Sequence, residues 1–557
     1  MLYKILIDQH YSSWTIHNEE NMNLVEELSI NPLEKKLFTT DIFDESFNII
    51  TSPMREEKNI PGILLLAGKT YGRSKNGNGR FYYKCIPNDK RLPSFLVPYE
   101  EKKSDFNKNK VNQYILFKYA EWNTKHPIGV LTNRIGNIKS LTSFYEYHLY
   151  CKNLVISLKE FTKDVNKIMK ENPGISFTDN ICNQYPNIEN RTDHYIITID
   201  PAGSIDLDDA VGLKDNVLSI YIANVPLLMD ELQIWDSFSQ RISTIYLPDR
   251  KCPMLPTILS ENLCSLLENE QRLAFCIDII FEGQEIIDIK FCNTLINVHK
   301  NYIYEDDNML KDKHYIDILQ CCTNLCKKYK YMKEIRDSHD VVAYLMVLMN
   351  TQSANKMLEF KNGIYRTLQL APIENDKISS EIIDFIKIWQ SSSGAYTSYE
   401  NKTTHDLVCG GIDNYIHITS PIRRLVDLLN MMQLQNNLGL MSLTNSAKEF
   451  YSVWFAKLDY INISMRAIRR VQTDCNILYL CVNRPETLDK IYDGYIFDKI
   501  ERVNKNLQYT VYIPSIKIIT RVNIKEDMED YSCHKFKLYL IEDGVTLKRK
   551  IRAEIIQ

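Results

Sequence analysis

The segment IDPAGSIDLDDA, from Ile199 to Ala210, decides how the rest of the chain is interpreted. It follows an apolar strand-like run and carries four carboxylates close together: Asp200, Asp206, Asp208 and Asp209. Charges of one sign at this spacing repel strongly where the dielectric is low, so burial without a counter-ion is untenable. Oxygen ligands without a Cys/His grouping favour Mg²⁺, Mn²⁺ or Ca²⁺ over zinc. We therefore expect a divalent-cation site here.

Two other interpretations of the acidic segment are weaker. An EF-hand calcium loop beginning at Asp206 needs Gly five residues later and Glu at its twelfth position, where this chain has Val211 and Val217. A solvated acidic loop would not need the apolar strands on either side, nor the Pro-Ala-Gly turn within it.

A second informative string is YIHITSPIRRLVDLL, from Tyr415 to Leu429. Thr419 or Ser420 is a suitable N-cap and Pro421 suits the first helical position, which predicts a helix from Pro421 to Gln435. Arg423 and Arg424 would then lie in its first turn, beside free N–H groups that favour an anion. The alternative is that Arg423 only pairs with Asp427 one turn later, which contributes a few tenths of a kcal/mol, roughly, on a surface.

Composition limits the class of protein. The 557 residues are 44% hydrophobic and 25% charged, with a net charge of -4, which excludes a wholly basic nucleic-acid binder. It leaves room for a groove lined by local Lys and Arg clusters. The first apolar run is too short for a signal or membrane segment, and the 14 cysteines contain no Cys-x-x-Cys pair. We expect a soluble intracellular protein, cytoplasmic or nuclear, without a membrane partner.

Short aromatic and β-branched runs occupy Ile63 to Leu154 and return from Asp493, which predicts a small β-barrel in each region. Aromatic side chains in the first region alternate with cations, as suits stacked bases and phosphates. Strand alternation requires about half of these aromatics to be core. The residues concerned are Phe81, Tyr82, Tyr83, Phe117, Tyr119 and Trp122, with Arg73, Lys75, Arg80, Lys84 and Lys118. The other predicted helices cover Leu158–Lys170, Tyr315–Ile335, Val341–Phe360 and Ser380–Trp389.

Together these strings resemble the ribonuclease II, or RNB, family of exoribonucleases. The stretch STIYLPDRKCPMLPTILSENLCSLLENEQRLAF, from Ser243 to Phe275, is similar to the family segment that follows the acidic motif. IPNDKRLPSFLVP and YAEWNTKHPIGVLTNRIG are similar to the second cold-shock barrel of the eukaryotic exosome-type branch, and YTVYIPSIKI to its terminal OB-fold. The N-terminal endonuclease domain of that branch does not fit into the opening segment.

The resemblance implies a role for each matching residue. Asp200, Asp206, Asp208 and Asp209 correspond to the acids that organise Mg²⁺ (or Mn²⁺), and Asp208 to the acid most critical for cleavage. Arg423 corresponds to the arginine on the 3′-terminal phosphates, and Tyr246 to the aromatic that stacks on the last nucleotides. Catalysis is assigned to Asp208, Asp209 and Arg423. Substrate contacts are assigned to Tyr246, Arg424, Arg366 and His417.

The implied fold is multidomain α+β. It has an unassigned segment or partial cold-shock barrel at 1–60, a cold-shock (OB-type) domain at 61–155, a mixed α/β RNB catalytic domain at 156–488, and a C-terminal OB-type barrel at 489–557. The implied reaction is processive, Mg²⁺-dependent 3′→5′ hydrolysis of single-stranded RNA to nucleoside 5′-monophosphates, by a metal-assisted in-line displacement with two ions. Protein partners are unknown.

Some positions depart from the family pattern. After the two arginines the family has Tyr and a His-Arg pair where this chain has Leu425 and Met431-Met432, and Ala343 and Tyr344 replace an acidic pair ahead of Asn350. These departures motivate the alternative of a catalytically impaired RNA-binding or scaffold protein. The four aspartates oppose it. A calcium-dependent structural protein lacks the loop pattern.

Overall fold

The structure, a computed structural model, describes residues 1–556 except 27, 29, 75–78, 101–109, 174–175, 369–378, 392–393, 408–409, 503–505 and 543–548. Lys75, one of the cations expected beside the aromatics, lies outside the described residues. The chain forms two compact units. Unit 1 comprises Met1–Val155, Leu247–Asp249 and Arg470–Gln557, and unit 2 comprises Ile156–Tyr246 and Arg250–Arg469.

The opening segment, which has no clear sequence period, is a small antiparallel sheet in the order β2-β1-β3-β4. Its strands are β1 (Leu2–Ile7), β2 (Trp14–Asn18), β3 (Ile42–Asp44) and β4 (Ile49–Thr51). Tyr3, Ile5 and Ile7 alternate along β1 and pack with Ile16 and Phe43 in a separate small core. The short strands explain why no period is visible in the sequence.

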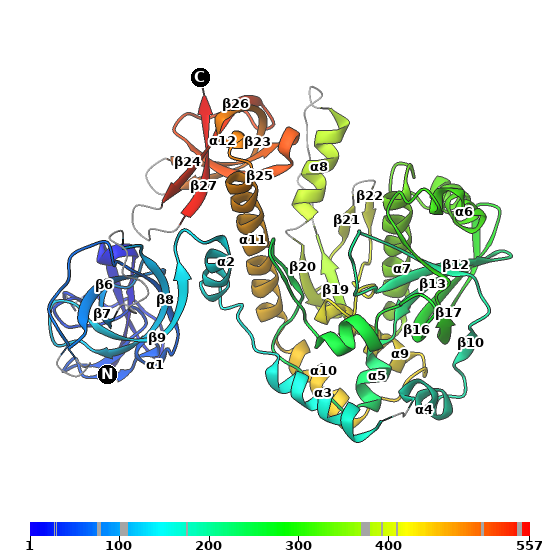
Figure 1. The fold of residues 1–557 in the computed structure, drawn as a ribbon, viewed down its shortest axis with the longest axis horizontal. Helices are drawn as coiled ribbons and strands as arrows, with labels where there is room; N and C mark the ends of the chain where they lie inside the picture. The colour runs from blue at the N-terminus through cyan, green and yellow to red at the C-terminus, as the bar shows by residue number, and fades with distance from the viewer. Residues whose placement is uncertain are drawn as a thin grey trace. The chain divides into compact units, whose positions relative to one another are not determined.

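A closed barrel follows, with strand order β5-β6-β7-β9-β8 (Figure 1). Its strands are β5 (Ile60–Leu64), β6 (Phe81–Pro87), β7 (Phe95–Tyr99), β8 (Gln113–Glu121) and β9 (Ile128–Asn137). Tyr83, Phe117 and Trp122 are buried inside it, whereas Phe81 is 39% exposed. The predicted division of the aromatics between core and surface is therefore found.

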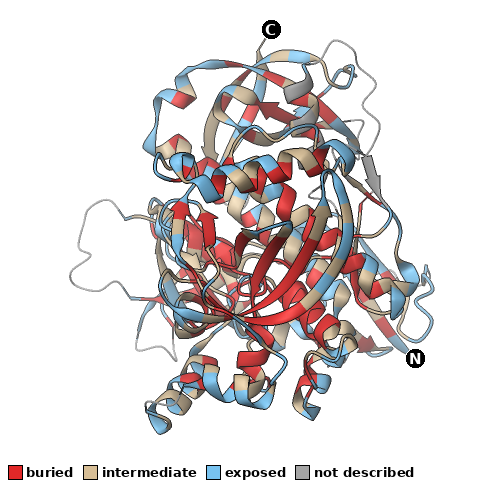
Figure 2. Cartoon of the chain, turned by 90° about the vertical axis from the view of Figure 1, so that its right-hand side faces the viewer, coloured by how far each residue is buried: buried red, intermediate tan, exposed pale blue. Residues whose placement is uncertain are grey.

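Unit 2 is organised around a seven-stranded sheet in the order β10-β17-β16-β13-β12-β11-β18. Neighbouring strands are antiparallel except for the outer pairs β10/β17 and β11/β18. The strands are β10 (Glu189–Arg191), β11 (Ile196–Asp200), β12 (Asp209–Lys214), β13 (Val217–Ala223), β16 (Gln271–Glu282), β17 (Glu285–Asn297) and β18 (Lys300–Ile303). The central strands are largely buried in Figure 2.

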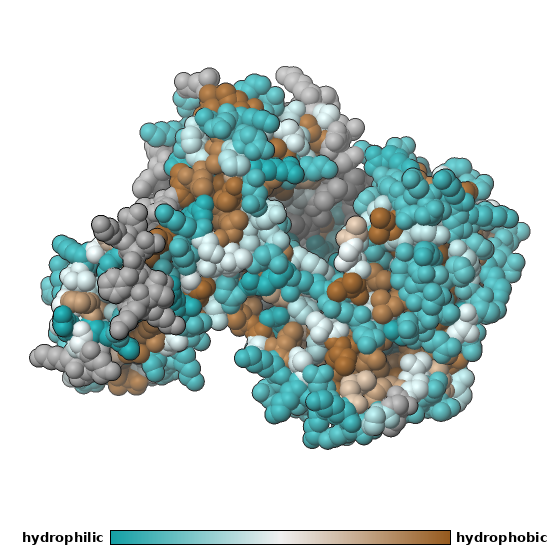
Figure 3. Space-filling model, in the orientation of Figure 1, coloured by the Kyte–Doolittle hydropathy of each residue, from teal (hydrophilic) through white to brown (hydrophobic). Residues whose placement is uncertain are grey.

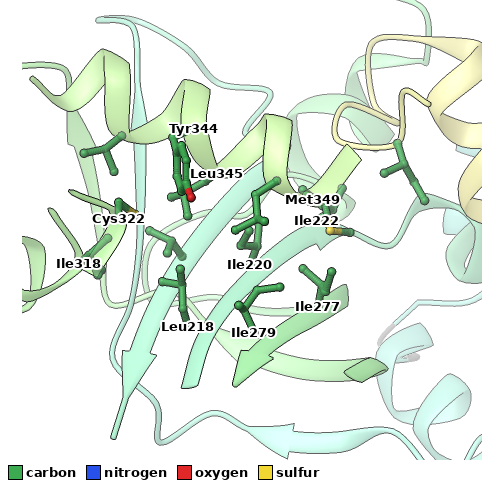
Figure 4. Close-up of a cluster of buried hydrophobic side chains, with 14 of the residues drawn as sticks. Leu218, Ile220, Ile222, Ile277, Ile279, Ile318, Cys322, Tyr344, Leu345 and Met349 are labelled. Atoms are coloured by element: carbon green, nitrogen blue, oxygen red, sulfur yellow. The ribbon is translucent and has the colours of Figure 1, made fainter. Parts of the chain in front are cut away.

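Two helices, α6 (Lys313–Lys328) and α7 (Ser338–Glu359), pack on one face of this sheet. Alternate residues of β13 and β16 point at them, because successive side chains of a strand face opposite sides. Figure 4 labels Leu218, Ile220, Ile222, Ile277 and Ile279 from the sheet against Ile318, Cys322, Tyr344, Leu345 and Met349 from the helices. The helix predicted to reach Ile335 ends at Lys328.

The structure has further helices, one of which adds Met431 and Leu434 to this core. They are α1 (Pro53–Glu56), α2 (Leu141–Tyr150), α3 (Lys159–Glu171), α4 (Phe177–Gln184), α5 (Val225–Glu231), α8 (Ser380–Ser391), α9 (Leu425–Asn437), α10 (Asn445–Phe455), α11 (Leu458–Asn483) and α12 (Glu486–Asp489). Among the described residues, none of the helices combines the length and apolarity that a membrane crossing requires. The surface of unit 2 in Figure 3 is mostly hydrophilic, with isolated hydrophobic patches.

Three two-stranded ladders complete unit 2, and a five-stranded antiparallel sheet ends the chain, in the order β25-β24-β23-β26-β27. The ladders are β14 (Ile245–Tyr246) with β15 (Lys251–Cys252), β19 (Ile364–Thr367) with β20 (Ala395–Ser398), and β21 (His405–Leu407) with β22 (Gly410–Ile412). The terminal strands are β23 (Ile491–Arg502), β24 (Asn506–Ile513), β25 (Ile518–Ile524), β26 (Cys533–Glu542) and β27 (Arg549–Ile556). The predicted fold class is confirmed: multidomain α+β, with OB-type β domains before and after a mixed α/β body along the chain.

Candidate active site

The acidic segment connects two neighbouring strands of the seven-stranded sheet, since β11 ends at Asp200 and β12 begins at Asp209. Gly203 turns the chain with φ +83°, a conformation that L side chains rarely adopt. The Ser265 hydroxyl then fixes the loop, donating to the Ile205 carbonyl at 2.9 Å and accepting the Leu207 N–H at 3.0 Å. The carboxylates are thus presented by a loop that other groups hold in place.

Asp208 is buried, and both of its carboxylate oxygens are occupied. Oδ1 accepts the Ile422 backbone N–H at 2.9 Å, and Oδ2 accepts Nε of Arg423 at 3.1 Å. Burial raises the pKa of Asp208 to about 7, although Arg423 and the Ile422 N–H both favour the ionised form. The two motifs identified in the sequence therefore meet at this carboxylate.

Asp200 and Asp209 interact with each other, and among the described residues neither forms an ion pair. Burial, followed by the charges of Asp200 and Asp208, raises the pKa of Asp209 to about 8. Burial also raises the pKa of Asp200 to about 6, against a hydrogen bond from Thr198 and the charge of Arg423. Oδ2 of Asp200 is buried and has no hydrogen-bond partner among the described residues.

These features fit a divalent cation. An orphaned buried carboxylate oxygen is costly unless something binds it, and the adjacent Asp209 offers a second oxygen ligand. Hard cations such as Mg²⁺ prefer oxygen ligands of this kind. The residues that would hold the ion are Asp200 and Asp209, with Asp208 next to them.

Asp206 is held by a different set of contacts. Nζ of Lys251 lies 3.0 Å from its Oδ1, and the same Nζ lies 2.9 Å from Oε1 of Glu261. The hydroxyl of Tyr246 lies 3.5 Å from Oδ2 of Asp206. Burial raises the pKa of Tyr246 to about 12, and the charge of Asp206 adds to the effect. The aromatic ring expected to bind substrate, which is 40% exposed, therefore stands directly beside an expected metal ligand.

The predicted start of the helix at Pro421 is wrong. Residues 421–423 form a turn, Arg424 is extended at φ -136° and ψ 126°, and α9 begins only at Leu425. A β-bridge between Ser243 and Arg424 holds this conformation, and the Arg423 carbonyl accepts the Thr244 N–H at 3.0 Å. The arginines consequently precede the helix. The Ile422 N–H donates to Asp208, and the N–H groups of Arg423 and Arg424 donate to the Ser420 carbonyl.

The sequence left open an ion pair between Arg423 and Asp427. In the structure, Arg424 forms this ion pair with Asp427 instead. Nη2 of Arg424 donates to Oδ1 of Asp427 at 2.8 Å and to the Ser420 hydroxyl at 3.2 Å. Ser420 also accepts Nη2 of Arg423 at 3.0 Å, and its backbone N–H donates to Asp427 at 2.8 Å. Ser420 therefore fixes both guanidinium groups, a role that its residue type alone did not indicate.

Arg366 and His417, the other expected substrate-binding residues, are brought together around Tyr396. The Tyr396 hydroxyl lies 2.8 Å from Nδ1 of His417, and the Arg366 guanidinium lies 5.9 Å from the Tyr396 ring centroid. Burial, then the charges of Arg424 and Arg366, lowers the pKa of His417 well below its usual range. His417 is therefore a neutral ring at pH 7.

Several site residues were missed by sequence reasoning. Lys251 and Glu261 lie within the segment similar to the family, but nothing local marks them as partners of Asp206. Tyr304 follows β18, its N–H donates to the Asp200 carbonyl at 3.1 Å, and its ring stacks on His339 at 3.7 Å. Asn430 is buried and binds the backbone of both Ile364 and His417. The sequence signal for Asn430 is its position among the apolar residues of the buried face of α9.

Of the positions that depart from the family pattern, Ala343 is exposed and the other four are buried core residues. Leu425, Met431 and Met432 are fully buried in α9, and Tyr344 is buried in α7. None of the four pairs with an acidic residue of the site in the described part of the chain. The departures alter the packing behind the site rather than the carboxylates or arginines.

Comparisons with known proteins find two domain types in this chain. A model of the RNB domain matches residues 189–334, and a model of the Dis3-like cold-shock domain 2 (CSD2) matches residues 82–146. The RNB match includes the four aspartates but stops before Arg423. The chain contains an RNB domain and a Dis3-like cold-shock domain, which confirms its resemblance to the RNB family.

Individual relatives are named as nucleases. The chain is 30% identical over 285 residues to DIS3-like exonuclease 2 of Schizosaccharomyces pombe, covering 45% of this chain and 28% of that protein. It is 25% identical over 279 residues to ribonuclease R of Mycoplasmopsis pulmonis, covering 48% and 36%. The matches thus span about a third of these relatives' length. The human exosome complex exonuclease RRP44 is 22% identical over 580 residues, covering 85% and 58%.

Solved structures share the fold over most or all of the chain. Mycoplasma genitalium RNase R in complex with ribose-methylated single-stranded RNA has a TM-score of 0.68 at 18% identity, and the match covers 100% of both chains. Yeast Ssd1, a pseudonuclease, has a TM-score of 0.58 at 14% identity, covering 91% of this chain and 72% of that one. The fold therefore occurs in a nuclease and in a pseudonuclease, so activity has to be argued from the site residues.

Proposed function

We propose that this chain is a Mg²⁺-dependent exoribonuclease that hydrolyses single-stranded RNA processively from the 3′ end to nucleoside 5′-monophosphates. The observation that carries the proposal is the contact of Asp208 with Arg423 and with the Ile422 N–H. It joins the carboxylate cluster to the arginine pair across 215 positions of sequence. A metal site and an anion site side by side suit phosphodiester hydrolysis.

Each side chain has a separate task. Asp200 and Asp209 hold the cation, with Mn²⁺ as an alternative to Mg²⁺, and Asp208 orients Arg423. When bound, the cation supplies Lewis-acid polarisation of the phosphate and lowers the pKa of bound water. Arg423 and Arg424 hold the terminal phosphates, because a guanidinium binds phosphate oxygens in a fixed planar geometry.

The proposed reaction breaks one phosphodiester bond per cycle. The oxygen of water bonds to the phosphorus of the last linkage, and the bond from phosphorus to the 3′ oxygen of the preceding nucleotide breaks. That 3′ oxygen takes up a proton, the water gives up a proton to solvent, and the terminal nucleotide leaves with its 5′-phosphate. The shortened RNA ends in a new 3′-hydroxyl, which permits the next cycle.

Binding of the RNA is assigned to rings and cations around this centre. Tyr246 stacks on the last bases, and Arg366 and the neutral His417 contact the strand next to them. The solved relative with ribose-methylated single-stranded RNA supports this substrate class. The cold-shock and C-terminal OB-type domains, with boundaries proposed at 61–155 and 489–557, bind the strand by stacking and phosphate contacts.

The test is the shortening of a 5′-labelled single-stranded RNA in Mg²⁺. The wild-type protein should produce a ladder or a short end product, and both EDTA and Asp208→Asn should abolish it. Asp288→Asn, an exposed acid on β17, is the matched control and should leave the activity unchanged. Binding of the RNA by the folded wild-type protein without any shortening would instead support the RNA-binding or scaffold alternative.

A further inference from the structure

Lys251 contacts the acidic segment, and the proposed function gives it no task. Tyr246 and Lys251 are directly paired across the β14/β15 ladder, so their side chains lie on the same face of this hairpin. Both reach Asp206, one through its hydroxyl and one through its ammonium. The hairpin therefore presents an aromatic ring and a cation to the same carboxylate.

The ammonium of Lys251 is bound on two sides. It lies 3.0 Å from Asp206 and 2.9 Å from Glu261, and the side chains of Lys251, Asp206 and Glu261 are only 21%, 10% and 25% exposed. An ordinary surface ion pair is solvated and contributes little. A lysine held between two half-buried acids is fixed in place, and its compact charge compensates a carboxylate much as a metal ion would.

Two of the four aspartates are paired with basic side chains of the protein, which leaves the other two available to a metal ion. Asp208 is paired with Arg423, and Asp206 is paired with Lys251. Within the described residues, no ion pair involves Asp200 or Asp209, and Oδ2 of Asp200 is the orphaned buried oxygen. When both are ionised, these two carboxylates carry two negative charges together, which a single divalent cation balances.

We propose that Lys251 takes the place of a second divalent cation, so that the site binds one ion, at Asp200 and Asp209. The inference rests on the proposed function and changes the two-ion scheme expected from the family resemblance. Lys251 is a positioning residue: it keeps Asp206 and the Tyr246 hydroxyl in place and adds a positive charge beside the ion. Glu261 in turn keeps Lys251 in place.

The experiment counts bound Mn²⁺ on the metal-free full-length chain by electron paramagnetic resonance during a titration with the metal alone. We expect one ion per chain for the wild type and for Lys251→Arg, which keeps the charge. Lys251→Met frees Asp206 and Glu261 and should raise the count to two. Lys328→Met, which removes a lysine paired with Glu285 on the surface, is the matched control and should leave the count at one.

The outcomes separate this inference from the proposed function. Two ions on the wild type, or one ion on correctly folded Lys251→Met, overturns the role of Lys251, while RNA shortening by the same wild-type sample leaves the proposed function standing. No bound Mn²⁺ and no RNA shortening overturns both. The wild-type count decides the question even where circular dichroism finds that Lys251→Met does not fold.

Discussion

Nε of Arg423 lies 3.1 Å from Oδ2 of Asp208, so the cation of one sequence motif neutralises the most buried acid of the other. The acid is almost fully buried, whereas 44% of the arginine side chain is exposed. One edge of the guanidinium is therefore engaged by the protein, and the exposed part is free to meet an anionic substrate. The same contact therefore positions the arginine and favours the ionised form of the carboxylate.

Replacing Arg423 with Lys should lower the rate of RNA shortening about 10²- to 10³-fold. Lysine keeps the charge but cannot reach Asp208 and Ser420 at once, because it lacks the planar fork of the guanidinium. The measurement is single-turnover hydrolysis of a labelled RNA. Arg336→Lys, an exposed arginine paired with Asp340, is the control. Equal rates for the two variants would contradict the assigned role of Arg423.

The metal-free protein should lose stability as the pH rises from about 5, where the carboxyls of an unfolded chain are ionised, to about 8. Asp208 and Asp209 have folded-state pKa values of about 7 and about 8, above those of an unfolded chain. The folded protein therefore holds more protons than the unfolded chain in this range, so unfolding releases protons and a rising pH favours it. The loss should be on the order of 1 kcal/mol per pH unit at most for each group.

Urea unfolding in EDTA at several pH values measures this effect. Saturating Mg²⁺ should suppress the loss, because a bound cation stabilises the ionised carboxylates. Asp209→Asn should flatten the dependence in EDTA by removing the group with the higher pKa. A stability that stays constant over this pH range in EDTA would mean that these carboxylates are already ionised in the folded protein.

Much of the site could be predicted because its chemistry is concentrated in two short strings. The four aspartates, both arginines and Tyr246 were identified from spacing and resemblance, and the structure gathers them around the end of β11 and the start of β12. Their roles stay predictions. Long apolar runs and regular alternation also predicted the fold class and the helices α3, α6, α7, α8 and α9, but not the longest helix, α11.

The errors come from contacts between distant segments. Ser420 and Pro421 are good helix-starting residues, but the bridge from Ser243 to Arg424 holds the chain extended and delays α9. Tertiary pairing outweighs a local cap preference of about 1 kcal/mol. Lys251 and Glu261 were missed for the same reason, since their significance depends on Asp206, which lies 45 positions before the lysine. The strands at 1–51 were too short to show a period.

Tyr246→Ala should lengthen the end product of RNA shortening without abolishing hydrolysis. In the wild type the Tyr246 ring is 40% exposed and can stack on the last bases. The variant lacks this ring. Stacking contributes about 1–3 kcal/mol per base, so the final RNA should dissociate while it is still longer. High-resolution gel analysis of a 5′-labelled RNA measures the length. Tyr460→Ala, with a ring 37% exposed on α11, is the matched control, and an unchanged length in Tyr246→Ala would argue against stacking.

Asn430→Ala should destabilise the protein by about 2–4 kcal/mol. The side chain is fully buried, accepts the Ile364 N–H at 2.9 Å, and donates to the carbonyls of Ile364 at 2.9 Å and His417 at 3.0 Å. Its loss leaves these backbone groups unsatisfied. Urea unfolding should find little change for Asn436→Ala, an exposed position on the same helix. Similar stabilities of the two variants would show that Asn430 does not hold β19 and His417 in place.

The most direct test of the proposed function is the identity of the first nucleotide released from a 3′-end-labelled single-stranded RNA in Mg²⁺. We predict that the wild-type protein releases the label as a nucleoside 5′-monophosphate from the start of the reaction, and that Asp208→Asn releases none. Release of a nucleoside 3′-phosphate, internal fragments that keep the label, or full-length RNA that stays bound and intact would contradict 3′-end hydrolysis at this site.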